Sequence, residues 1–178
     1  MEALSAQPSD VLFTLAEVAV AFAGFASIVA VFQVRLTPAG TPFDLFRFWV
    51  MLAFSLATLL FSLVPFLLHF LGLDDAAVWR VSSVLLGAFV LGNGAFVARL
   101  IVKRVPNVVS SLDPAISIVA NLTYLVALLA QAANVLGAWG GPGFGLYLLG
   151  LLMILLGAAV NFVRLVWVGT AGLRPRPE

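Results

Sequence analysis

The chain has 178 residues, of which 63% are hydrophobic and 10% are charged, and its formal net charge is +1. A soluble domain carries about 25% charged residues, so this composition does not provide a surface for water, and lipid is expected to surround most of the chain. The near-zero net charge argues against a nucleic-acid partner, and the absence of cysteine excludes disulfides and thiolate chemistry. Because His69 is the one histidine, a multi-histidine haem or zinc site cannot be built within one chain.

Five apolar segments follow one another along the chain, each near the roughly 20 residues that cross the hydrocarbon core of a bilayer. They cover residues 11–34, 43–71, 76–102, 115–136 and 143–168. The acidic N-terminus and the length of the first segment differ from a signal peptide, so this segment is interpreted as a transmembrane helix. Asp74 and Asp75 are expected to cap the third helix. The sequence therefore predicts an all-α integral membrane protein, a single domain over residues 1–178 built as a bundle of five transmembrane helices.

The basic residues predict the orientation of this bundle. Of the nine lysines and arginines, all but Arg80 fall at one side when the helices alternate in direction. Short loops rich in Lys and Arg stay in the cytoplasm, which predicts an external N-terminus and a cytoplasmic C-terminus. The arginine-rich composition further suggests a bacterial inner membrane. Arg47, Arg99 and Arg164 are expected about one turn inside their helix ends, either as snorkelling anchors or as a ring that attracts anions or lipid headgroups.

The first helix contains the most informative residue, Glu17, about six residues and 9 Å beyond the expected start of the helix. Thr14, Ala21 and Gly24 share its face. An acidic side chain at the centre of a bilayer costs on the order of 2.5–3.5 kcal/mol, so an intramembrane carboxyl is a functional hypothesis. The helix is also rich in alanine, which predicts that it is tightly packed rather than peripheral and lipid-facing.

Two interpretations of Glu17 remain open at this stage. The carboxyl group can form a hydrogen bond to His69 or Gln131 that only orders the bundle. Alternatively, it can be an ion- or proton-binding position.

The second helix contains Pro65, which lacks the N–H that would bond to the carbonyl of Phe61. We expect a serine or a water molecule to satisfy this carbonyl. Polar residues share an arc of this helix, and they predict either packing against neighbouring helices or a hinge or hydrated pathway. They are Arg47, Ser55, Thr58, Ser62 and His69.

The fourth and fifth helices carry four of the eight amide side chains of the chain. Asn121, Tyr124, Gln131 and Asn134 share an arc of about 140° on the fourth helix, which must face protein or water. Packing and the lining of a pathway explain this arc equally well. The fifth helix places five residues on one side, and the glycines among them predict close approach of neighbouring helices: Tyr147, Gly150, Gly157, Asn161 and Arg164. The third helix repeats this feature with Gly87 and Gly94.

No catalytic constellation is present in the sequence, and no cofactor or metal site is expected. The leading hypothesis is a homo-oligomeric transport protein, most simply a cation or proton channel, because one five-helix bundle fills its own interior whereas several copies can surround an axis. The pathway candidates are Glu17, Gly24, Asn121, Gln131, Asn134 and Asn161. The alternative is a non-transporting accessory or scaffold subunit that binds another membrane protein or lipid. The expected partners are membrane lipids, further copies of the chain and a small ion.

Overall fold

The computed structural model describes residues 7–36, 42–104, 114–138 and 140–171. These residues form five α-helices: α1 (Pro8–Leu36), α2 (Pro42–Phe70), α3 (Asp75–Arg104), α4 (Pro114–Val135) and α5 (Phe144–Ala171). Each of the five is long and apolar enough to cross a membrane. The prediction of an all-α fold is therefore confirmed, and the helix ends lie within a few residues of the expected ones.

The helices begin and end at residues suited to those positions. Pro42 and Pro114 are the first residues of α2 and α4, where a missing N–H costs no helical hydrogen bond. The Asp74 carboxylate accepts a hydrogen bond from the Ala77 N–H at 3.0 Å and caps α3, as predicted. At the end of α2, Gly72 has a φ of +83°, and its N–H donates to the carbonyl of His69 at 3.0 Å. This left-handed glycine turns the chain directly into α3.

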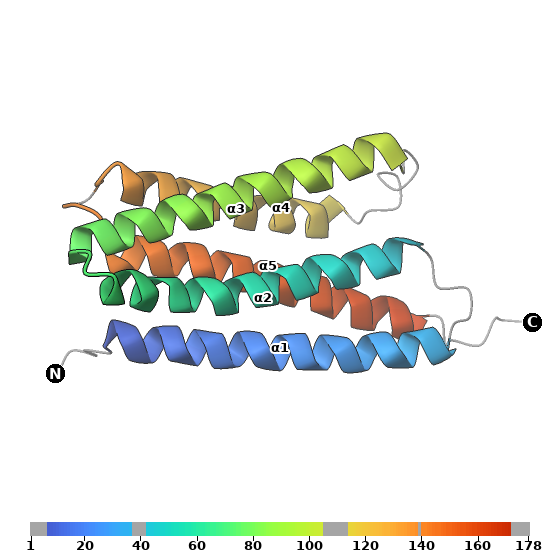
Figure 1. Ribbon diagram of the computed structural model, residues 1–178. Coiled ribbons are helices and arrows are strands. Elements are labelled where there is room, and N and C mark those ends of the chain that lie inside the picture. Colours follow the sequence, from blue (N-terminus) through green and yellow to red (C-terminus); the bar gives the residue numbers. More distant parts are fainter. Residues whose placement is uncertain (1–6, 37–41, 105–113, 139, 172–178) are drawn as a thin grey trace, which may run out of the picture.

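The bundle has two central helices with one helix on one side and two on the other (Figure 1). α2 and α5 pack against each other in the middle. α1 lies against α2 and, less extensively, α5, whereas α3 and α4 pack together on the opposite side. We call the end of the bundle where α1, α3 and α5 begin its N-terminal end. Among the described residues α1 contacts neither α3 nor α4, so α1 forms one edge of the protomer and the α3–α4 pair forms the other.

The prediction that the first helix is tightly packed and not peripheral is wrong within one chain. Ala19 and Ala26 are fully buried, so the alanines do let α1 approach its neighbours closely. This packing uses one face only, because α1 has neighbours on one side. Val18, Val20 and Phe25 are all exposed on the remainder of the helix. Counting alanines predicts a close contact but not the number of helices that surround α1.

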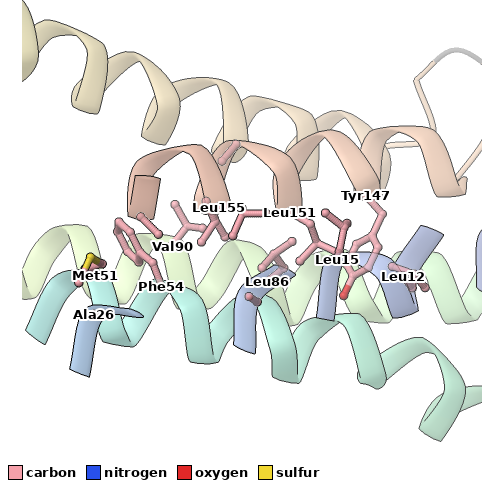
Figure 2. Packing of buried hydrophobic residues seen from close by; sticks show 14 residues of the cluster. Leu12, Leu15, Ala26, Met51, Phe54, Leu86, Val90, Tyr147, Leu151 and Leu155 are labelled. Carbon is pink, nitrogen blue, oxygen red and sulfur yellow. The ribbon is translucent and has the colours of Figure 1, made fainter. Parts of the chain in front are cut away.

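Apolar side chains fill the space between the helices (Figure 2). Leu12 and Leu15 of α1 belong to the same buried cluster as Leu86 of α3 and Leu151 of α5. Aromatic pairs fix the helices along their axes. They are Phe13–Phe66 between α1 and α2, Phe61–Phe89 between α2 and α3, and Phe54–Tyr124 between α2 and α4, with ring centroids 4.9, 5.6 and 5.3 Å apart.

Candidate functional site

The face of α1 that points away from α2 and α5 carries a stripe of small and polar residues. It consists of Thr14, Glu17, Ala21 and Gly24, all exposed, and we call it the α1 stripe. At 100° per residue the four positions fall within an arc of about 80°. Leu12, Leu15, Ala19 and Ala26 lie on the opposite, buried face. The sequence prediction that these four residues share one face is confirmed, and no described part of the chain covers that face.

Glu17 differs from the other polar groups of α1 because nothing local satisfies it. The Thr14 hydroxyl donates to the Asp10 carbonyl at 2.8 Å, and the Ser27 hydroxyl donates to the Ala23 carbonyl at 2.9 Å. The Glu17 carboxyl group forms no hydrogen bond or ion pair with any side chain or backbone group that the structure describes. Since Pro8 begins α1, Glu17 lies about 13 Å from the start of the helix, compared with the 9 Å expected from the sequence.

The structure does not bring His69 to Glu17. Phe13 stacks on Phe66, and α1 and α2 run in opposite directions, so position 69 lies level with about position 10 of α1. Glu17 is seven residues further along, or about 10 Å away along the helix axis. His69 is exposed at the end of α2. The expected hydrogen bond between these two side chains is therefore absent, and the cause is the register of the two helices.

Gln131 is not a partner of Glu17 either, because it lies inside the bundle between α3 and α5. Its Nε2 donates to the Leu146 carbonyl at 3.2 Å, and its side chain is 1% exposed. The carboxamide occupies the space that a Cβ at Gly150 would need, and a Cβ at Gly87 would lie 3.5 Å from the Gln131 Cβ. Both glycines thus make room for this amide, which confirms the prediction that they allow close packing.

Asn134 joins three helices, one turn further along α4. Its Nδ2 donates to the Ser83 hydroxyl of α3 at 2.8 Å, and its Oδ1 accepts from the Gly143 N–H, just before α5, at 2.7 Å. The side chain is completely buried. Of the two interpretations of the α4 arc, this geometry favours packing for Asn134, because both ends of the carboxamide are bonded to protein.

The carbonyl freed by Pro65 also has a partner. The Tyr147 hydroxyl of α5 donates to the Phe61 carbonyl of α2 at 2.5 Å. The prediction that this carbonyl needs an outside donor is confirmed, but the donor is a tyrosine rather than a serine or water. Ser82 of α3 lies beside the same hydroxyl. The sequence signal that could have identified the donor is the position of Tyr147, one of two tyrosines, within an apolar helix.

The remaining candidate residues are dispersed over the bundle. Asn161 donates locally to the Gly157 carbonyl at 2.8 Å and is half-buried. Asn121 is exposed on α4, at the edge opposite α1. Arg99 is exposed towards the end of α3, whereas the side chains of Arg47 and Arg164 lie outside the described residues. Of the six predicted pathway residues, the structure places only Glu17 and Gly24 on a common surface.

A cavity of about 10 Å³ lies between α2, α4 and α5 and is lined by Phe54, Thr123 and Met153, among others. This volume accommodates about one water molecule. In the ranges that the structure describes, no three His, Cys, Asp or Glu side chains gather in a group able to hold a metal ion.

Comparison with protein-family models, curated proteins and solved structures found no match for the chain. The geometry of the α1 stripe is therefore the basis for a functional assignment. An exposed carboxyl group inside a long apolar helix can bind a cation, transfer a proton or pair with a polar group of another polypeptide. No group in the described part of the chain forms a hydrogen bond or an ion pair with Glu17, so a binding partner for it would come from outside these residues.

Proposed function

We propose that the protein is an integral membrane protein of the bacterial inner membrane that assembles from several copies and conducts a small cation or protons. The N-terminal end of the bundle faces outward and the C-terminus lies in the cytoplasm, as the distribution of arginines indicates. Five helices of sufficient length and hydropathy support the membrane location. In this assembly the α1 stripe of each copy lines a central axis.

The observation that carries the proposal is the uncovered Glu17. A carboxyl group about 13 Å along a transmembrane helix lies within the hydrocarbon region, where its exposure to lipid costs up to about 2.5–3.5 kcal/mol. Within the described chain it has no partner. Contact with water in a pore, or with the same residue of other copies, removes this cost. A ring of carboxylates around a water-filled axis favours cations over anions.

The opposite edge of the protomer suits a lipid environment. The Phe13–Phe66 and Phe61–Phe89 contacts place Glu17 at the level of the middle of α3. Near this level the exposed side chains of α3 and α4 are apolar. They include Leu85, Leu91, Leu125 and Leu129. A neighbouring copy that packed this edge against α1 would place leucines on the carboxyl group. With α1 at the central axis, Glu17 is kept away from lipid. With the α3–α4 pair outermost, the exposed leucines face lipid.

A second candidate function is that of an accessory subunit without transport activity. Gly24 favours this alternative, because nothing lies within 4 Å of a Cβ added there. An open glycine on an uncovered helix face lets a helix of another membrane protein approach closely. A polar residue of that protein would then cover Glu17. Co-purification of such a partner at fixed stoichiometry, with no flux by the isolated protein, would support this function.

Flux measurements in liposomes test the transport proposal. Purified wild-type protein is expected to release a gradient of monovalent cations or protons, and Glu17→Gln is expected to reduce that flux about tenfold. Asp75→Asn is the matched control, because Asp75 is an exposed carboxylate in the first turn of α3, away from α1. Absence of flux in the wild type, or equal flux in Glu17→Gln and Asp75→Asn, would contradict the proposal.

A further inference from the structure

The hydrogen bond between the Tyr147 hydroxyl and the Phe61 carbonyl lies where α2 lacks one of its helical hydrogen bonds. Pro65 is buried inside the helix and supplies no N–H to the Phe61 carbonyl, so one helical hydrogen bond is missing there. The replacement comes from α5, 86 residues further along the chain. In a regular helix the Phe61 carbonyl would be bonded within α2. Here its bond runs to α5 instead, so this bond helps to set the position on α5 of the α2 segment that follows Pro65.

The segment of α2 beyond Pro65 is coupled to the part of α1 that carries Glu17. Phe66 stacks on Phe13 with the ring planes 22° apart. In the described part of the chain, α1 packs mainly on α2, less extensively on α5, and contacts neither α3 nor α4. Leu12 and Leu15 belong to the same buried cluster as Tyr147, as Figure 2 shows. A change in the position of Phe66 is thus transmitted to the turns that present Thr14 and Glu17.

The surroundings of Tyr147 provide a second place for its hydroxyl proton. Ser82 is completely buried and lies within hydrogen-bonding reach of that hydroxyl. Ser62, next to Phe61 in α2, is also completely buried, and its hydroxyl forms no hydrogen bond with the described part of the chain. Rotation of the tyrosine hydroxyl towards Ser82 would keep the donor satisfied while it releases the Phe61 carbonyl. The released arrangement leaves the Phe61 carbonyl without this donor, so it is the less populated of the two states that a conformational switch requires.

We propose that the Tyr147–Phe61 hydrogen bond is a latch that controls the position of the Glu17 face of α1. In the latched state the Tyr147 hydroxyl of α5 holds α2 at Phe61, and α2 carries α1 in the observed position. In the released state α2 bends at Pro65, and Phe66 moves Phe13 together with the α1 stripe. This inference rests on the proposed function, because it describes how the pathway along α1 opens and closes.

Labelling of a single introduced cysteine tests the latch independently of any flux. The chain has no cysteine, so Thr14→Cys is the one thiol in the protein. Its rate of modification by a water-soluble thiol reagent in membranes is expected to change about fivefold when Tyr147→Phe removes the hydroxyl. Tyr124→Phe is the control, because it removes a tyrosine hydroxyl from α4 and leaves the α2–α5 bond intact.

A second substitution separates the latch from a general loss of packing. Pro65→Ala supplies the N–H that the Phe61 carbonyl lacks, so Tyr147→Phe should no longer change the labelling rate in that background. If Tyr147→Phe alone does not fold, the double variant is expected to fold, and its labelling rate is compared with that of Pro65→Ala. The latch is refuted if Tyr147→Phe changes the rate equally in both backgrounds or in neither. If the wild type gives no flux but Tyr147→Phe changes the labelling rate of Thr14→Cys, the channel proposal is contradicted and the latch is supported.

Discussion

Removal of the Tyr147 hydroxyl is expected to destabilise the bundle through one identifiable group, the Phe61 carbonyl. Tyr147→Phe keeps the ring and its contact with Trp79, whose centroid lies 5.8 Å away, and deletes only the donor. The carbonyl is then without a partner at a position where Pro65 prevents a helical hydrogen bond. A buried unsatisfied carbonyl costs about 1–3 kcal/mol, whereas interhelical hydrogen bonds in membranes average about 0.6 kcal/mol. We expect a loss of about 1–2 kcal/mol in the free energy of unfolding.

The measurement is reversible unfolding of the purified protein in mixed detergent micelles, followed by circular dichroism. Tyr147→Phe is compared with wild type, and the same substitution is then made in the Pro65→Ala background. Because the introduced alanine provides the missing N–H, the loss should fall below about 0.5 kcal/mol there. An equal loss in both backgrounds would show that the hydroxyl acts through some group other than the Phe61 carbonyl, and it would refute this reasoning.

Two further predictions concern the polar side chains inside the bundle. Gly150→Ala should lower the free energy of unfolding by about 1–3 kcal/mol, because the added Cβ overlaps the Gln131 carboxamide, whereas Gly145→Ala, with nothing within 4 Å, should leave it unchanged or raise it. Equal effects at the two glycines would contradict the described packing of Gln131. Asn134→Ala should cost about 1–3 kcal/mol, since the Gly143 N–H and the Ser83 hydroxyl both lose a partner. In the same unfolding assay, a change below about 0.5 kcal/mol would show that these groups find other partners.

The helices could be predicted from the sequence because their signal is local. Length and hydropathy locate each segment, and single residues such as Asp74 mark a helix end through hydrogen bonds within one turn. The neighbours of each helix could not be predicted in the same way. In a soluble bundle the polar face identifies the outside, but here Leu129 on the exposed face of α4 and Leu151 in the core are equally apolar. Alanine content therefore did not show that, within one protomer, α1 has neighbours on one side only.

The candidate site was predictable in part for a related reason. Glu17 stands out in any apolar segment, and helical periodicity correctly placed Thr14 and Gly24 on its face. The hydrogen bond considered between Glu17 and His69 is not formed, because the register between α1 and α2 is set by Phe13 and Phe66. These two residues interact across 53 positions of sequence, a distance over which the sequence gives no signal. The donor to the Phe61 carbonyl was missed because Tyr147 reaches it from a helix that the sequence does not show to be adjacent.

Cross-linking between copies tests the central claim, that the α1 stripes of neighbouring copies face one another. Gly24→Cys and Leu129→Cys each place one thiol at an exposed position, on α1 and on the α3–α4 edge respectively. Purified protein in lipid is treated with a bifunctional thiol reagent that spans about 10 Å, the distance between packed helices. The account predicts covalent dimers for Gly24→Cys and monomers for Leu129→Cys. Dimers for Leu129→Cys with monomers for Gly24→Cys would contradict it.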